Sequence, residues 1–320
     1  MKALDVTALG ELLIDFTQNG LSNQGNYLME ANPGGAPCNV LAMLAKLGKK
    51  TAFIGKVGDD FLGHHLKTVV QEVGIDTSSL LLDEKVHTTL AFVHTYPDGD
   101  RDFSFYRDPG ADMNLRAEEV NEELIAQSRI FHFGSLSMTH PGILQATKKA
   151  LRIAKEQGCI ISYDPNLRPP LWNTLEEARE RIAFGMTQCD ILKISDNEIQ
   201  WFTGMEDYDE GISFLQQTYH IPLILLSMGP AGSRAYYREV RVEAKPFLQG
   251  NTIETTGAGD TFCACVLNYV LEHGLDHLTE AQLHEMLEFA NAAASLITTR
   301  KGALKVMPCR KEIEQMIGRR

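Results

Sequence analysis

The sequence lacks several patterns that would place it in large classes of proteins. Basic residues do not dominate it: 30 Lys and Arg face 42 Asp and Glu, and the net charge of -12 argues against nucleic acid or an anionic membrane as a partner. No apolar run reaches transmembrane length and the N-terminus carries no apolar signal core, so we expect a cytoplasmic protein. The segment Gly10-Glu-Leu-Leu-Ile-Asp15 does not supply the Gly-x-Gly-x-x-Gly pattern of dinucleotide-dependent oxidoreductases. A phosphate-binding loop of the form Gly-x4-Gly-Lys-Ser/Thr is also absent.

The cysteines show no Cys-x-x-Cys pairing, which speaks against a metal or redox motif built on such a pair. Most of the six lie in apolar segments, where buried free thiols are expected, in keeping with a reducing compartment. They are Cys38, Cys159, Cys189, Cys263, Cys265 and Cys309.

The 320 residues suffice for one large α/β domain or two small ones. Short apolar runs predict buried strands at 5–10, 51–57, 130–134, 160–163, 191–194 and 223–227. Helical spacing of apolar residues predicts helices at 39–47, 62–73, 142–156, 175–186 and 211–219. This alternation indicates a mostly parallel sheet with helices on both faces, whose ligands gather at the carboxyl ends of the strands.

One region departs from this alternation. Residues 89–96 and 101–106 alternate like two strands, and turn residues 97–100 between them predict a β-hairpin. Residues 12–17 and 27–30 read as two further short strands around a polar loop. A small sheet beside a large α/β core is the architecture of a lid, with a decorative hairpin as the alternative.

The most informative segment is Ile253-Glu-Thr-Thr-Gly-Ala-Gly-Asp-Thr-Phe262, which precedes a strongly apolar helix ending at Gly274. A turn of small residues that opens a helix leaves N–H groups pointing at one spot, which makes an anion site. We expect Gly257, Ala258 and Gly259 to form it. Asp260 lies in the first turn, where a carboxylate does not help to bind an anion. We therefore expect it to take a proton from a nucleophile that attacks the anion, with a favourable partner of the helix dipole as the alternative.

This segment resembles the Asp-Thr-x-Gly-Ala-Gly-Asp signature of the ribokinase-like (PfkB) carbohydrate kinases. Four other segments resemble the family in order along the chain, and the last two look most like motifs of bacterial and plant fructokinases. They are Gly34-Gly-Ala-Pro-Cys-Asn39, Gly55-Lys-Val-Gly-Asp-Asp-Phe-Leu-Gly63, Phe105-Tyr-Arg-Asp-Pro-Gly-Ala-Asp112 and Asp164-Pro-Asn-Leu-Arg-Pro-Pro-Leu-Trp172. The resemblance implies a single kinase domain over residues 1–320, with a three-layer α/β/α core and a β-sheet lid inserted at about 12–31 and 87–107.

For the sugar, the resemblance and the residue types together suggest two groups of contacts. Asp15 falls at the family's hydroxyl-binding aspartate, Gly35 lets the backbone approach, and Asn39 offers an amide, although it could instead be a plain N-cap. The motifs typical of fructokinases add Phe105, Arg107, Asn166 and Arg168. Either arginine could instead form a salt bridge with Asp108 or Asp112, and Phe105 could be a core residue.

For the nucleotide, the resemblance implies contacts from Lys193, Ser195, Ser227, Gly229, Gly232 and Asn291. Asn291 begins a helix face of small residues, for which close packing is the alternative. Glu198 is the residue implied for Mg²⁺, through water; Ser195 stands where the family usually has asparagine. Glu254 stands where most of the family has an aspartate that helps to hold K⁺, so a K⁺ site stays open.

The resemblance thus implies an ATP-dependent sugar kinase acting on the primary hydroxyl of a ketohexose, with D-fructose first. Ribose, an aminoimidazole riboside or 2-keto-3-deoxygluconate are alternative substrates, the last disfavoured because Phe103 and Phe105 offer no counter-charge to its carboxylate. A non-catalytic sugar sensor is a further alternative, but it should have lost Asp260 or the glycines. The resemblance also raises a homodimer through the lid.

Overall fold

The strands belong to two sheets within residues 2–95 and 101–319, the part of the chain that the computed structural model describes. The larger sheet has nine strands in the order β13 (Val240–Ala244), β12 (Ser233–Tyr237), β11 (Leu223–Ser227), β10 (Ile191–Ser195), β9 (Ile160–Asp164), β8 (Ser128–Gly134), β1 (Leu4–Leu9), β4 (Thr51–Gly58) and β5 (Ile75–Asp83). Strands β5 to β11 of this order are parallel, and β12 and β13 are antiparallel to their neighbours.

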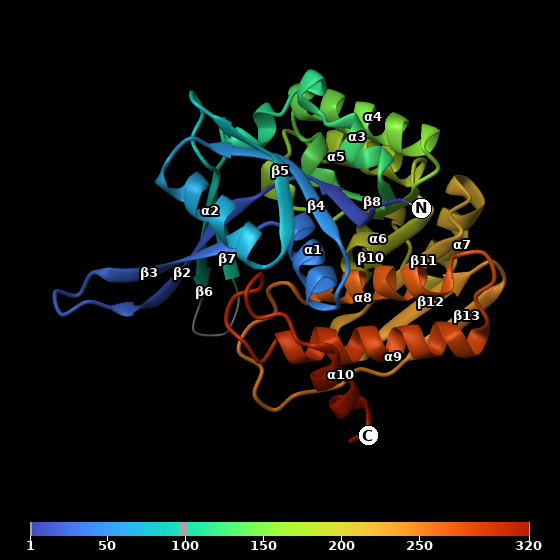
Figure 1. Ribbon diagram of the computed structural model, residues 1–320. Helices are drawn as coiled ribbons and strands as arrows, with labels where there is room; N and C mark the ends of the chain where they lie inside the picture. The colour runs from blue at the N-terminus through green and yellow to red at the C-terminus, as the bar shows by residue number, and fades with distance from the viewer. Residues whose placement is uncertain (1, 96–100, 320) are drawn as a thin grey trace.

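Helices cover both faces of this sheet (Figure 1). One face packs against α1 (Ala36–Lys46), α2 (Phe61–Glu72), α8 (Ala258–His273), α9 (Glu280–Ile297) and α10 (Arg310–Ile317). The other packs against α3 (Glu122–Ala126), α4 (Pro141–Glu156), α5 (Leu175–Met186), α6 (Asp196–Thr203) and α7 (Tyr208–Tyr219). Each face has its own buried apolar cluster, so the expected three-layer α/β/α class with a mostly parallel sheet is confirmed.

Six predicted strands coincide with β1, β4, β8, β9, β10 and β11 to within about two residues at either end. The sequence prediction missed β5 and β13, which lie at the two edges of the sheet, and β12, which lies between β11 and β13. Continuous apolar runs, on which the prediction depended, are typical of strands buried on both faces. Edge strands alternate instead: β13 reads intermediate, exposed, buried, exposed, buried along Val240–Ala244.

The smaller sheet consists of β3 (Tyr27–Gly34), β2 (Leu13–Leu21), β6 (Leu90–Thr95) and β7 (Arg101–Tyr106), in that order. These are the segments expected to form the lid, and the β2–β3 hairpin projects from the body of the molecule (Figure 1). The predicted turn 97–100 lies outside the described residues. Because β3 extends to Gly34, it leads directly into α1, and the lid and the core share this junction.

Helix α1 begins three residues before the predicted start, with Gly35 as its N-cap. The alternative interpretation of Asn39 as an N-cap is therefore wrong: Asn39 lies inside the helix. In the described part of the chain, no helix combines the length and the apolar character that crossing a bilayer demands.

Candidate active site

The start of helix α8 forms the floor of a cavity between the smaller sheet and the core. Gly257 caps the helix with a φ of 74°, a left-handed conformation that favours glycine. A Cβ at this position would also lie 2.8 Å from the Cβ of Ala303, so the turn has no room for a side chain. The helix behind the turn is buried from Thr261 to Leu271, which fixes the turn against the core.

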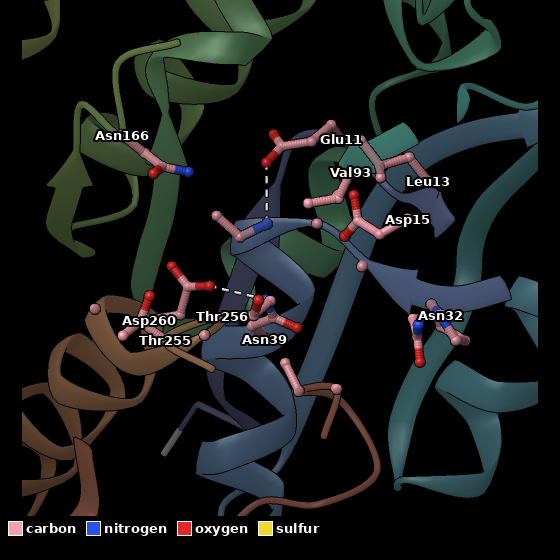
Figure 2. Close-up of a pocket in the computed structure, with 18 of the residues that line it drawn as sticks. Glu11, Leu13, Asp15, Asn32, Asn39, Val93, Asn166, Thr255, Thr256 and Asp260 are labelled. Carbon is pink, nitrogen blue, oxygen red and sulfur yellow. Dashed lines mark hydrogen bonds between the residues drawn. The ribbon is translucent and has the colours of Figure 1, made fainter. Parts of the chain in front are cut away.

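Asp260 lies in the first turn of α8, as expected, and its carboxylate faces the cavity. The amide nitrogen of Asn39 donates a hydrogen bond to Asp260 Oδ2 at 2.8 Å, across 221 residues of chain (Figure 2). Burial raises the pKa of Asp260, while this hydrogen bond and the charges of Lys193 and Arg168 work against the rise. The environment thus moves the carboxyl toward the range in which it can exchange a proton near neutral pH.

Of the three residues expected to form the anion site, Gly257 and Gly259 line the cavity and Ala258 does not. The N–H of Ala258 donates to the carbonyl of Thr255 at 3.2 Å, because the chain turns tightly just before the helix. The assignment of Ala258 is thereby corrected. The N–H groups of the remaining first turn have no acceptor within the helix, which is the general property of helix N-termini that anions use.

Lys193, in the middle of β10, brings a cation to this helix start. Its Nζ lies 3.0 Å from Asp164 Oδ2, and a Cβ added to Gly259 would lie 3.1 Å from the same Nζ. Burial disfavours the ammonium, but the charges of Asp164 and Glu198 outweigh it and raise the pKa of Lys193. The ammonium therefore stays charged beside the first turn of α8, and the missing side chain at 259 keeps the space between them open.

The cavity above this floor has a volume of about 350 Å³, near the small end of the range for ligand sites in proteins. Carboxyl groups of Glu11, Asp15 and Asp260 border it, and the amide of Asn166 lies across the cavity from Asp15 (Figure 2). Burial raises the pKa of Asp15 to about 7; Arg168 counteracts this rise, and the charges of Glu254 and Asp260 add to it. The cavity thus combines several acids with two cations, Arg168 and Lys193.

Six of the seven residues expected to bind the sugar line this cavity: Asp15, Gly35, Asn39, Phe105, Asn166 and Arg168. Gly35 has a φ of 130°, and a Cβ there would lie 2.4 Å from the carbonyl oxygen of Glu11. Asn166 also adopts a left-handed backbone, with a φ of 45°, and its N–H donates to Asp164 Oδ1 at 3.1 Å. Both conformations turn polar groups at the carboxyl ends of strands toward one space.

Arg107 is the exception among these seven. It does not line the cavity; its guanidinium is buried and donates to Asp112 Oδ2 at 2.8 and 2.6 Å, to Thr139 at 2.9 Å and to the carbonyl of Leu136 at 3.0 Å. The salt bridge with Asp112, the alternative weighed for this arginine, is what the structure contains. The expectation that Arg107 contacts the sugar is corrected accordingly.

The residues expected to bind the nucleotide also include some that line the cavity and some that do not. Lys193 lines the cavity, whereas Ser195 is the N-cap of α6 and forms a capping box with Glu198. The Glu198 carboxylate accepts hydrogen bonds from Ser195 N, Ser195 Oγ and Leu167 N at 2.7 to 2.8 Å. Burial opposes ionisation of Glu198, but Lys193 and these hydrogen bonds outweigh it and lower its pKa.

Ser227 ends β11, Gly229 and Gly232 follow it, and all three lie outside the cavity lining. Gly232 has a φ of 99°, and a Cβ there would lie 2.3 Å from the carbonyl oxygen of Ala244. The amide of Asn291 donates to the carbonyls of Ala244 and Lys245 at 3.2 Å each. Asn291 thus holds α9 against the end of β13, which is the packing alternative rather than an amide free for an adenine.

Sequence reasoning missed several lining residues, among them Glu11, Asn32, Val93 and the pair Gly302–Ala303. Glu11 directly follows β1 and could have been noted from its position at the carboxyl end of a strand. The others give no local signal, because they come from the lid and from a loop near the C-terminus. Glu254 also lines the cavity, and its Oε1 accepts the N–H of Gly302 at 2.6 Å.

The described residues contain no group of three or more His, Cys, Asp or Glu side chains that could hold a metal ion.

The geometry agrees with comparisons to known proteins. The sequence pattern of the pfkB family of carbohydrate kinases matches residues 3–309. The probable fructokinase-2 of Arabidopsis thaliana is 39% identical over 306 residues, which cover 95% of this chain and 92% of that protein. The crystal structure of a fructokinase from Xylella fastidiosa with bound ATP has a TM-score of 0.88 and 32% identity, covering 98% of both chains. A fructokinase from Vibrio cholerae O395, crystallised with fructose, ADP and calcium ion, has a TM-score of 0.86 and 26% identity, covering 98% of this chain and 99% of that one. The chain belongs to the pfkB family of carbohydrate kinases.

Proposed function

We propose that this kinase transfers the γ-phosphoryl group of ATP to the primary hydroxyl at C6 of D-fructose. The observation that carries the proposal is the floor of the cavity: Asp260, its partner Asn39 at 2.8 Å, and the Lys193 ammonium beside Gly259. This places a base, an amide that orients it and a positive charge around one point. Fructokinases from a plant and a bacterium, similar over nearly the whole chain, support fructose as the acceptor.

The chemistry is a direct displacement. The C6 hydroxyl oxygen attacks the γ-phosphorus, its proton passes to the Asp260 carboxylate, and the bond from the γ-phosphorus to the β,γ-bridging oxygen breaks to release ADP. Asn39 holds one carboxylate oxygen of Asp260, which orients the other toward the hydroxyl. The first-turn N–H groups of α8 and the Lys193 ammonium stabilise the charge on the transferred phosphoryl group.

The sugar end of the cavity suits a neutral polyol. Asp15 and Asn166 offer an acceptor and an amide to ring hydroxyls, Phe105 offers an apolar face, and Arg168 is the only guanidinium among the lining residues of the described chain. Because Glu11, Asp15 and Glu254 are all acidic, a sugar acid such as 2-keto-3-deoxygluconate would meet repulsion here. This favours fructose over that alternative.

Two cations would bind at the end of the site where the nucleotide phosphates lie. Glu198, whose carboxylate stays ionised because of its lowered pKa, would hold Mg²⁺ through water, and the ion would supply positive charge to the phosphates. A monovalent cation such as K⁺ would be held by Glu254, which would share its carboxylate with the N–H of Gly302.

We also propose a homodimer through the lid. Strand β3 is an edge of the smaller sheet, and the hairpin exposes Leu21, Tyr27 and Leu28 by 58%, 68% and 47%. Exposed apolar side chains along a sheet edge are typical of an interface. Light scattering of the purified protein would test it, with a monomer at micromolar concentration as the contradicting result. The free thiol state of all six cysteines favours a reducing, cytoplasmic location.

The decisive experiment is an ADP-release assay across fructose, ribose, glucose, 2-keto-3-deoxygluconate, adenosine and an aminoimidazole riboside. Fructose should give the highest kcat/KM, and the phosphate should appear at C6 in the NMR spectrum of the product. Repeating the assay with Mg²⁺ chelated, and with K⁺ replaced by tetramethylammonium, tests the two cations. A higher kcat/KM for any other sugar on this panel would replace fructose as the substrate.

A further inference from the structure

A glutamate with no role in the mechanism above lies in the wall of the same cavity. Glu11 follows β1 and is only 3% exposed. Its Oε1 accepts the N–H of Ala36, the first residue of α1, at 3.0 Å (Figure 2). Its Oε2 is buried, and the described residues supply it with no hydrogen-bond partner. One oxygen of this carboxyl group therefore accepts a hydrogen bond, and the other accepts none from the described residues.

An unsatisfied carboxyl oxygen is costly away from water, so its persistence calls for an explanation. Arg107, the cation whose charge acts on Glu11, does not supply the missing donor, because its guanidinium donates to Asp112, Thr139 and the carbonyl of Leu136. Burial raises the pKa of Glu11 to about 7, although the bonds to the backbone and the charge of Arg107 work against the rise. The site is thus an acceptor that the protein itself leaves incomplete.

The position of Glu11 relative to the base Asp260 limits which ligand group can donate the missing hydrogen bond. Glu11 binds the first residue of α1, and Asn39, three residues later on the same helix, binds Asp260. These two attachment points are about 4.5 Å apart along the helix axis. Glu11 therefore borders the cavity about one helical turn from the reacting hydroxyl, where other hydroxyls of a small sugar would lie.

We propose that Glu11 is a specificity-determining residue whose second carboxyl oxygen accepts a hydrogen bond from a sugar hydroxyl other than the one that is phosphorylated. This inference rests on the proposed sugar kinase function. It assigns to Glu11 a contact separate from those of Asp15, Asn166 and Arg168. It also explains why a carboxyl group is kept in a cavity that already contains three other acids.

The test compares wild type with Glu11→Gln, which keeps an oxygen for the N–H of Ala36 but replaces the second acceptor by an NH₂ donor. The matched control is Glu119→Gln, which makes the same chemical change at a carboxylate that binds Lys56 outside the cavity. The substrates are D-fructose, its 1-deoxy, 3-deoxy and 4-deoxy analogues, and 2,5-anhydro-D-mannitol, which lacks the hydroxyl at C2.

We expect Glu11→Gln to raise the KM for fructose about tenfold, because a charge-assisted hydrogen bond is lost. Its kcat should stay within about threefold of wild type and its KM for ATP should not change. One analogue, the one lacking the bound hydroxyl, should show the same KM in both proteins. Glu119→Gln should match wild type on every substrate.

Two results would overturn the inference. An unchanged KM for fructose in Glu11→Gln would mean that no hydroxyl binds there. An equal rise in KM for every analogue would mean that Glu11 acts only by holding the turn at Ala36. If wild type does not phosphorylate fructose, the proposed function fails, and the same KM ratio is measured on the panel sugar that wild type does phosphorylate. Direct titration of sugar into each protein gives the same comparison where turnover is too slow to measure.

Discussion

Replacing the base gives the sharpest test of the mechanism. Asp260→Asn keeps the shape of the side chain, and an amide oxygen at this position can still accept the hydrogen bond that Asn39 donates at 2.8 Å. The Lys193 ammonium and the glycines of the turn are untouched. The substitution therefore removes the capacity to accept a proton and little else.

The expected loss follows from the contribution of general base catalysis. A positioned base typically contributes about 10²–10⁴ in rate, so kcat should fall by that factor, equivalent to about 2.7–5.4 kcal/mol of activation free energy. Stability should change in the opposite direction. Because the fold raises the pKa of Asp260, the ionised carboxylate destabilises the folded protein at pH 8, and a neutral asparagine should keep or raise Tm there.

The measurements are single-turnover phosphorylation of fructose, nucleotide affinity by titration, and thermal unfolding at pH 8. Asp209→Asn is the matched control, since Asp209 binds Arg241 and Tyr236 far from the cavity. That variant should leave kcat unchanged. A turnover of Asp260→Asn within tenfold of wild type would refute the base assignment, and a collapsed Tm would show that the carboxylate supports the fold instead.

Further predictions concern the helix start, the buried ion pair, the cavity acid and the lid. Gly259→Val should abolish transfer without unfolding α8, because even a Cβ lies 3.1 Å from Lys193 Nζ; activity assays with circular dichroism check this. Arg107→Ala should lower the free energy of unfolding in urea by about 3–5 kcal/mol, because it leaves Asp112 buried and unpaired; a loss under 1 kcal/mol would contradict it. Glu11→Gln should stabilise the protein by about 3 kcal/mol at pH 8 and by little at pH 4, since the raised pKa makes wild type lose stability as pH rises from about 4.5 to 7; denaturant titration at both values tests the sign. Sugar binding should slow hydrogen exchange in β6 and β7, and equal exchange with and without sugar would make this sheet a fixed wall.

The alternation of apolar strands and helices was enough to predict most of the fold. The run Gly257–Asp260 was enough to predict the helix start that bears the proposed base. These features are local: a strand buried on both faces is continuously apolar, and a helix start needs small residues wherever an anion approaches. The position of Asp260 in the first turn of α8 was predictable for that reason.

The sequence did not determine which hydrogen-bond or ion-pair partner each polar side chain has in the fold. Arg107 stands in a motif with many polar residues, and the local sequence does not determine whether it binds Asp112 or a sugar. The fold determines it, because Asp112, Thr139 and a carbonyl group lie together around the buried guanidinium. Asn291 was ambiguous for the same reason, because its acceptors, the carbonyls of Ala244 and Lys245 at the end of β13, lie 47 and 46 residues away. Glu11 could be noted from its position after a strand, but its hydrogen-bond partner at Ala36 and its unpaired oxygen follow only from the fold.

The hydrogen bond between Asn39 and Asp260 has a consequence for synthesis of the chain. The ribosome makes the amide early and its carboxylate partner 221 residues later, so a nascent chain has no catalytic floor until α8 has emerged. Until then, the side of α1 that packs against α8 remains uncovered, although its other side can pack against β1 and β4. Such surfaces are prone to aggregation and are typical clients of chaperones. Activity in this protein should therefore appear only after nearly the whole chain has been translated, as a late event rather than a gradual one.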